Sequence, residues 1–149
     1  MKKALITGVT GQDGSYLADF LLKKNYQVFG SYRRTSHRQF ERLEAMNILD
    51  KIKLIYADLI DQTSLNHLVK TIQPDEIYNL GAQSFVGVSF VEPFLTTEVT
   101  GIGALRVFEA VKEFSPKSKI YQASSSEMFG NSEEIKTENS RLQPASPYG

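Results

Sequence analysis

Side chains that could act as acids, bases or hydrogen-bond donors gather in the last part of the chain. Ser125 and Glu127 follow a short apolar run, and Tyr148 stands beside Gly149. A serine hydroxyl can hold a substrate oxygen, and a carboxylate close by can move a proton. A tyrosine is a poor base at its free pKa of about 10, unless a cation such as a lysine one helical turn later lowers that pKa. These residue types favour acid–base chemistry, although a run of serines is also typical of a polar loop.

A glycine-rich stretch near the N-terminus could bind a phosphate. Gly8, Gly11 and Gly14 have the spacing G-x-x-G-x-x-G, between a short apolar run and a helical pattern. A strand, a glycine turn and a helix in this order present backbone N–H groups and a helix N-terminus to an anion. We therefore predict a dinucleotide-binding turn, with a glycine-rich turn of some other α/β protein as the alternative. The predicted contacts of this stretch are Gly8, Thr10, Gly11, Gln12, Asp13 and Gly14.

Basic residues follow the second apolar run. An NAD site usually carries an acidic residue about twenty positions beyond the glycines, which holds the ribose 2′-hydroxyl. The segment 25–40 contains no acid and carries Arg33 and Arg34 instead. A guanidinium matches a 2′-phosphate in charge and in geometry. This pattern predicts NADP as the coenzyme, and a solvated basic loop is the alternative.

Two more turns provide candidate coenzyme contacts. These contacts are Asp58, Leu59, Leu80, Gly81, Ala82, Gln83 and Ser84. Asp58 is placed to reach an adenine amino group, but it could equally be a helix cap or a turn residue. A coenzyme could lie against the backbone of the two small residues that follow Leu80, and the polar residues after them could bind ribose or substrate hydroxyls. A tight turn between a strand and a helix would explain the same residues.

Short apolar runs alternate with helical stripes along the whole chain, which indicates repeated strand–helix–strand units. The first predicted strand begins at Ala4, and the other four cover 26–32, 53–57, 76–80 and 119–123. The first predicted helix follows the glycine turn, and the second covers 40–49. The third has Asp61 as its candidate N-cap and is ended by Pro74, and a long fourth helix runs from Pro93 to about Phe114. A loop is predicted from Gly130 onward. Right-handed crossovers then produce a parallel sheet with helices on both faces. We predict one doubly wound, Rossmann-type α/β domain over residues 1–149, with strand order 3-2-1-4-5.

The topology brings the candidate residues together, because they all follow the carboxyl ends of predicted strands, where an open α/β sheet binds its ligands. Composition excludes other classes of function. Lys and Arg total 17, as do Asp and Glu, so the chain has no electrostatic footprint for nucleic acid or an anionic membrane. There is no cysteine, and the two histidines, His37 and His67, are far apart, so we predict no metal site. The sequence contains neither a signal-peptide core nor a run of membrane-spanning length, which favours a cytoplasmic protein.

These motifs together resemble the extended short-chain dehydrogenase/reductases and, among them, the GDP-mannose 4,6-dehydratase family. The general features are the glycine turn, Asp58 after the third strand, and Tyr148 followed by glycine. The narrower features are Gly11–Gly14, Arg33–Arg34, Tyr78–Ser84, Tyr121–Ser124 and Ser146–Gly149. The resemblance covers the whole chain.

The resemblance implies a role for each candidate acid or base. Tyr148 matches the family's general base, Glu127 matches its catalytic glutamate, and Ser125 stands where these dehydratases usually carry threonine. The implied reaction oxidises C4 of GDP-mannose with NADP, removes the C5 proton through Glu127, expels water from C6 and returns the hydride to C6. The implied product is GDP-4-keto-6-deoxymannose. The resemblance also implies a dimer or tetramer, in which part of the basic segment 33–42 reaches the coenzyme of a neighbouring subunit.

The chain departs from the family after Tyr148. The lysine partner of the tyrosine and the region that holds most of the sugar nucleotide are absent from residues 1–149, so the chain resembles the coenzyme-binding front part of a longer enzyme. We expect this part to be inactive by itself. One alternative is a nucleotide-sugar epimerase or reductase, from which Glu127 distinguishes it. The other is a coenzyme-binding module without turnover, which the missing lysine favours.

Overall fold

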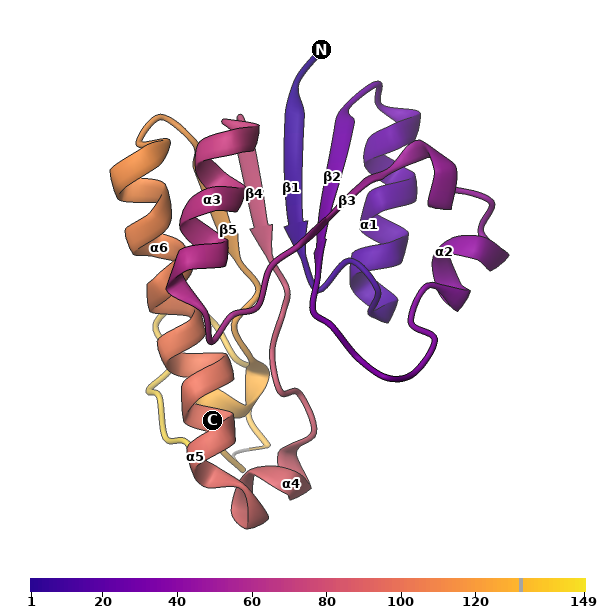
Figure 1. Cartoon of the computed structure of the whole chain (residues 1–149). Helices are drawn as coiled ribbons and strands as arrows, with labels where there is room; N and C mark the ends of the chain where they lie inside the picture. The colour runs from indigo at the N-terminus through magenta and orange to yellow at the C-terminus, as the bar shows by residue number, and fades with distance from the viewer. Residues whose placement is uncertain (132) are drawn as a thin grey trace.

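A parallel sheet of five strands forms the centre of the computed structural model, which describes residues 1–131 and 133–149 (Figure 1). The strands are β1 (Lys3–Thr7), β2 (Gln27–Tyr32), β3 (Lys53–Tyr56), β4 (Glu76–Asn79) and β5 (Lys119–Gln122). Their order is β3-β2-β1-β4-β5, and each neighbouring pair is parallel. The predicted doubly wound topology is confirmed, including the strand order.

The helices between these strands are α1 (Gln12–Lys23), α2 (Glu41–Ala45), α3 (Gln62–Ile72), α4 (Val86–Val91), α5 (Pro93–Thr96) and α6 (Gly103–Phe114). Short 3₁₀ turns cover Leu49–Lys51 and Ser126–Phe129. The predicted long helix does begin at Pro93 and end at Phe114, but its middle, Thr97–Ile102, is π-helical. The helix predicted over 40–49 is shorter, because Asn47 adopts a left-handed backbone with φ 55°. The apolar pattern does not predict α4.

The two faces of the sheet are covered by different helices, as Figure 1 shows, with α3 and α6 on one face and α1 and α2 on the other. Successive side chains of a strand point to opposite faces. Leu5 of β1 therefore packs with α3 and α6, whereas Ala4 and Ile6 pack with α1 and α2. Because both faces of β1 are buried, its sequence is a continuous apolar run rather than an alternating one.

Local signals set the ends of α3. The Asp61 carboxylate accepts hydrogen bonds from the backbone nitrogens of Thr63 and Ser64 at 3.0 and 3.3 Å, which confirms the predicted N-cap. At the other end Gln73 adopts a left-handed backbone with φ 49°, directly before Pro74. The helix begins immediately after the turn that carries Asp58, and it fixes that turn because the Asp58 backbone nitrogen donates to the Ser64 hydroxyl at 3.1 Å.

The carboxyl ends of the strands, the helices α4 and α5, and the C-terminal segment all lie toward one edge of the sheet (Figure 1). The predicted loop after Gly130 is confirmed for residues 131 and 133–149, which form neither helix nor strand. Within the described part of the chain, no helix combines the length and the apolar character needed to cross a bilayer.

Candidate functional site

A row of hydrogen-bonded polar side chains joins the carboxyl ends of three neighbouring strands. Thr7, Asn79 and Gln122 end β1, β4 and β5 and stand in register with one another. The Thr7 hydroxyl donates to Asn79 Oδ1 at 2.5 Å, and Asn79 Nδ2 donates to Gln122 Oε1 at 2.7 Å. The backbone nitrogens of Leu80 and Gly81 donate to Thr7 Oγ1 at 3.1 and 3.0 Å. This row holds the turn after β4 against the glycine turn. The sequence offers only a weak signal for it, a polar residue at the end of each apolar run.

The glycine turn packs so closely that two of its glycines leave no room for a side chain. Gly8 has φ +69°, and a Cβ there would lie 2.9 Å from the backbone nitrogen of Gly81. A Cβ on Gly14 would lie 2.3 Å from the Gly8 carbonyl oxygen. Gly11 is the N-cap of α1, and no side chain caps this helix. The first backbone N–H groups of α1 are therefore available to an anion.

Two clefts open beside this turn. One has a volume of about 530 Å³ and lies along the ends of β4 and β5, and the other has about 550 Å³ and lies along the ends of β2 and β3. The residues common to both linings are Gly8, Gly11, Leu80, Gly81, Ala82 and Ser84. Two compartments that meet at a turn with free backbone N–H groups have the layout that a dinucleotide needs, since its halves are joined by a pyrophosphate. The narrow backbone approach at the glycines supports the same fit.

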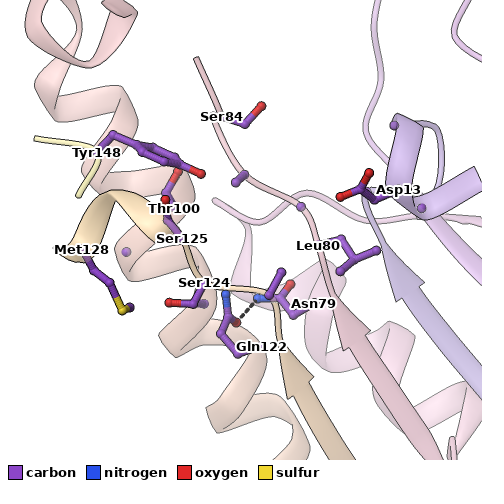
Figure 2. A pocket seen from close by; sticks show the side chains of 18 of the residues that line it. Asp13, Asn79, Leu80, Ser84, Thr100, Gln122, Ser124, Ser125, Met128 and Tyr148 are labelled. Atoms are coloured by element: carbon purple, nitrogen blue, oxygen red, sulfur yellow. Dashed lines mark hydrogen bonds between the residues drawn. The ribbon is translucent and has the colours of Figure 1, made fainter. Parts of the chain in front are cut away.

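The first cleft, along β4 and β5, contains two of the three predicted catalytic residues. Figure 2 shows Tyr148 near Ser125 and Thr100, across the cleft from Asp13. The Ser125 hydroxyl accepts a hydrogen bond from the Glu127 backbone nitrogen at 3.1 Å, so its own O–H can still donate to a ligand oxygen.

The backbone around these residues is tightly fitted. Ser124, which also lines the first cleft, has a left-handed backbone with φ 57°, a conformation that costs a non-glycine residue about 1–2 kcal/mol. Glu127 is half-buried in the 3₁₀ turn and is not among the residues that line either cleft. The chain end packs against it, since a Cβ on Gly149 would lie 2.7 Å from the Glu127 carbonyl oxygen. The structure therefore brings Ser125 and Tyr148 to one surface and places Glu127 directly beside that surface.

The second cleft, along β2 and β3, contains most of the predicted adenosine contacts. Arg33, Asp58 and Leu59 line it, whereas Arg34 is exposed and lines neither cleft. Asp58 is a turn residue, because its Oδ1 accepts a hydrogen bond from the Ile60 backbone nitrogen at 3.2 Å, and it also lines the cleft. Of the glycine-turn residues, Thr10 lines this cleft, and Gln12 and Asp13 line the other.

The side chain of Gln83 is occupied within the protein. Its Oε1 accepts from the Phe85 backbone nitrogen at 2.7 Å, and its Nε2 donates to Thr96 Oγ1 at 3.0 Å. The Gln83 backbone nitrogen donates to Thr100 Oγ1 at 3.1 Å. These bonds support the interpretation of this segment as a strand-to-helix turn, although Gln83 also lines the second cleft and Ser84 lines both.

Sequence reasoning does not single out Thr100 and Met128, and it includes Arg42 only as the end of the basic segment 33–42. Thr100 and Met128 line the first cleft. Arg42, from α2, donates to the carbonyl oxygen of Thr10 in the glycine turn at 3.3 Å. None of these contacts has a motif in the sequence, because each depends on how separate elements pack.

The five-stranded parallel sheet with helices on both faces defines a Rossmann-type α/β domain. Solved structures with this fold include the UDP-Glc/GlcNAc 4-epimerase of Campylobacter jejuni, with a TM-score of 0.89 and 22% identity over 100% of this chain and 45% of that one. The UDP-glucose 4-epimerase of Thermus thermophilus, solved with NAD, has a TM-score of 0.83 and 23% identity over 98% of this chain and 46% of that one.

Residues 5–149 match the sequence model of a protein family that is described as GDP-mannose 4,6 dehydratase. The chain belongs to this family. It is 51% identical to the GDP-mannose 4,6-dehydratase of Yersinia enterocolitica, over 99% of this chain and 42% of that protein. It is 47% identical to the human GDP-mannose 4,6 dehydratase, over 98% of this chain and 42% of that protein. The chain therefore spans less than half the length of these relatives.

Proposed function

We propose that this chain is the coenzyme-binding portion of an enzyme that converts GDP-mannose to GDP-4-keto-6-deoxymannose with bound NADP. The observation that carries the proposal is the meeting of two clefts at an uncapped helix N-terminus, with Arg33 in one cleft and Ser125 and Tyr148 in the other. Membership of the GDP-mannose 4,6-dehydratase family supplies the substrate class. A coenzyme-binding module without turnover would not need a tyrosine and a serine on one cleft wall.

Residues of both clefts would hold the adenosine and pyrophosphate parts of NADP. The N–H groups at the start of α1 would bind the pyrophosphate, and the backbone at Gly81 and Ala82 would lie against the coenzyme. Arg33 would bind the 2′-phosphate, and Asp58 the adenine amino group. Bound NADP would accept the hydride from C4 of the sugar and later return it to C6.

Residues of this chain would accept and donate the protons of the reaction. Ser125 donates a hydrogen bond to the C4 oxygen, and Tyr148 takes the proton from that hydroxyl as the C4–H bond breaks. The resulting ketone makes the C5 proton acidic, and the carboxylate of Glu127 removes it. The C6–O bond then breaks, and Glu127 returns its proton to the departing hydroxide, which leaves as water. C5 regains a proton when the hydride returns to C6, and the proton that Tyr148 took from the C4 hydroxyl completes the balance.

The enzyme test for this assignment is the variant Glu127→Gln in the complete protein. We expect the variant to bind NADP and GDP-mannose normally while dehydration falls about 10²–10⁴-fold, the range for loss of an acid–base group. Glu138→Gln, at an exposed position of the same C-terminal segment, is the matched control and should retain full activity. Normal turnover by Glu127→Gln, or a defect in binding alone, would give Glu127 a structural role.

We also propose that the complete protein is a cytoplasmic dimer or tetramer. The exposed Arg34, which lines neither cleft of its own chain, is then available to the coenzyme of a neighbouring subunit. Light scattering of the complete protein tests the assembly, and a monomer that binds NADP tightly would exclude it.

A further inference from the structure

Arg42 connects two elements that the sequence keeps apart. It lies near the start of α2, and its Nη1 donates to the carbonyl oxygen of Thr10 in the glycine turn at 3.3 Å. Thr10 and Arg33 both line the second cleft. The guanidinium of Arg42 is thus tied to a wall of the cleft in which Arg33 also lies.

The charge of Arg42 is not neutralised by its hydrogen-bond partner. A backbone carbonyl is uncharged, and among the described residues Arg42 forms no ion pair. A guanidinium has five N–H donors, and only the Nη1 group of Arg42 donates to Thr10. Arg38, in the same basic segment, differs because it forms an ion pair with Glu44. Arg33 lines the second cleft, and Arg42, which is exposed and lines neither cleft, is tied to a lining residue by its bond to Thr10, while Arg38 is already paired.

We propose that Arg42 is a second specificity-determining residue for the 2′-phosphate of NADP, contributed by α2 of the same chain. The inference rests on the proposed coenzyme. A phosphate presents three acceptor oxygens and about two negative charges, and arginine forks match such a group well. The bond to Thr10 holds one end of the Arg42 guanidinium and leaves the remaining donors for the phosphate. Binding of the 2′-phosphate would then join α2 to the glycine turn.

Calorimetric titration of the complete protein tests this proposal with two ligand pairs, NADP against NAD and 2′,5′-ADP against 5′-AMP. Within each pair the ligands differ only by the 2′-phosphate. We expect Arg42→Gln to weaken NADP and 2′,5′-ADP about ten- to a hundredfold, as for loss of a hydrogen bond to a charged group, and to leave NAD and 5′-AMP unchanged. The matched control Arg38→Gln, in the same segment, should leave the affinities for all four ligands unchanged. Arg42→Lys keeps the charge but loses the forked guanidinium. Its affinity for NADP and for 2′,5′-ADP should therefore lie between that of Arg42→Gln and that of the unmodified protein.

The variant Arg33→Gln separates failure of this inference from failure of the proposed coenzyme. If Arg33→Gln selectively weakens NADP but neither Arg42 variant does, the coenzyme assignment stands and the role of Arg42 is wrong. Equal losses of NADP and NAD in the Arg42 variants would show that Arg42 only positions the glycine turn, which also overturns the inference. If the unmodified protein binds NAD more tightly than NADP, and Arg33→Gln changes the two affinities equally, the coenzyme assignment itself is wrong.

Discussion

At the scale of single residues, Tyr78 and Glu76 form a polar cluster at the opposite edge of the sheet from the two clefts. The Tyr78 hydroxyl donates to Glu76 Oε2 at 2.9 Å, and Tyr26 and Lys2 donate to Glu76 Oε1 at 3.3 and 3.1 Å. Burial, together with the neighbouring carboxylate, raises the pKa of Tyr78 to about 12. Burial by itself would raise the pKa of Glu76, but the hydrogen bonds from Lys2, Tyr78 and Tyr26 outweigh it and lower that pKa.

These shifts predict a dependence of stability on pH at both extremes. The contribution of Tyr78 is fully present below its ordinary pKa of 10.0 and is lost as the pH rises toward about 12. The contribution of Glu76 is present above its ordinary pKa of 4.5 and is lost as the pH falls through its lowered value. We therefore expect the Tm difference between the unmodified protein and Tyr78→Phe to shrink from pH 10.0 to about 12.

Circular dichroism melts across this pH range measure that difference. Tyr121→Phe is the control, because the Tyr121 ring packs near Tyr78 but is itself exposed. A constant Tm difference between the unmodified protein and Tyr78→Phe over the whole alkaline range would show that the Tyr78 hydroxyl does not couple ionisation to folding.

At the scale of elements, α3 has a side-chain N-cap at its first turn and a buried apolar stripe. Its buried stripe packs under the sheet, and its first turn is held by the two hydrogen bonds that the Asp61 carboxylate accepts. We expect Asp61→Ala to lower the free energy of unfolding by about 1 kcal/mol, because two backbone N–H groups lose their acceptor. Urea denaturation monitored by circular dichroism measures this loss.

Asp61→Asn is the matched control for this prediction, because an asparagine oxygen can cap the same nitrogens. It should retain most of the stability that Asp61→Ala loses. An equal loss in both variants would attribute the effect to the charge of Asp61 rather than to capping.

The π-helical stretch Thr97–Ile102 is the element that borders both clefts. Thr100 lines the first cleft and Val99 lines the second. Arg106 of α6 fixes this stretch, since its Nη1 donates to the Glu98 carbonyl oxygen at 3.2 Å and its Nη2 pairs with the Glu98 carboxylate at 2.8 Å. π-helical bulges are frequent at functional sites. The position of this bulge, between the two clefts, agrees with the proposed coenzyme site.

At the scale of the whole molecule, β5 forms an open edge of the sheet. It pairs only with β4 among the described residues, and its Ile120 and Tyr121 side chains are 38% and 56% exposed. Exposed apolar strand edges invite association between chains. We therefore expect the chain of residues 1–149, expressed by itself, to bind NADP weakly, to self-associate and to show no dehydration of GDP-mannose.

Analytical ultracentrifugation of this chain over a range of concentrations tests the role of the edge. Tyr121→Lys should reduce the association, because a charge on an edge strand opposes pairing. Phe94→Lys, at an exposed aromatic position on α5, serves as the comparison. If Phe94→Lys disperses the chain and Tyr121→Lys does not, the association involves the α5 surface instead of the β5 edge.

The sequence by itself determined the features that depend on near neighbours along the chain. The five strands, the cap at Asp61, and the helix boundaries at Pro93 and Phe114 follow from apolar period, capping chemistry and proline geometry, which act within a few residues. Right-handed crossovers then convert this element order into the observed sheet. The meeting of the candidate residues at one edge of that sheet is a consequence of the topology.

Only the tertiary structure decided which side chains meet across long distances in the sequence. Thr7 and Asn79 are 72 positions apart, and Arg42 and Thr10 are 32 apart, so no local pattern links them. The apolar residues of α1 include Phe20, yet Phe20 is 53% exposed, whereas Ala18 is buried in the core one turn after Gly14, where a Cβ would clash with the glycine turn. Such contacts depend on strand register and helix packing, which are properties of the assembled fold rather than of any one segment.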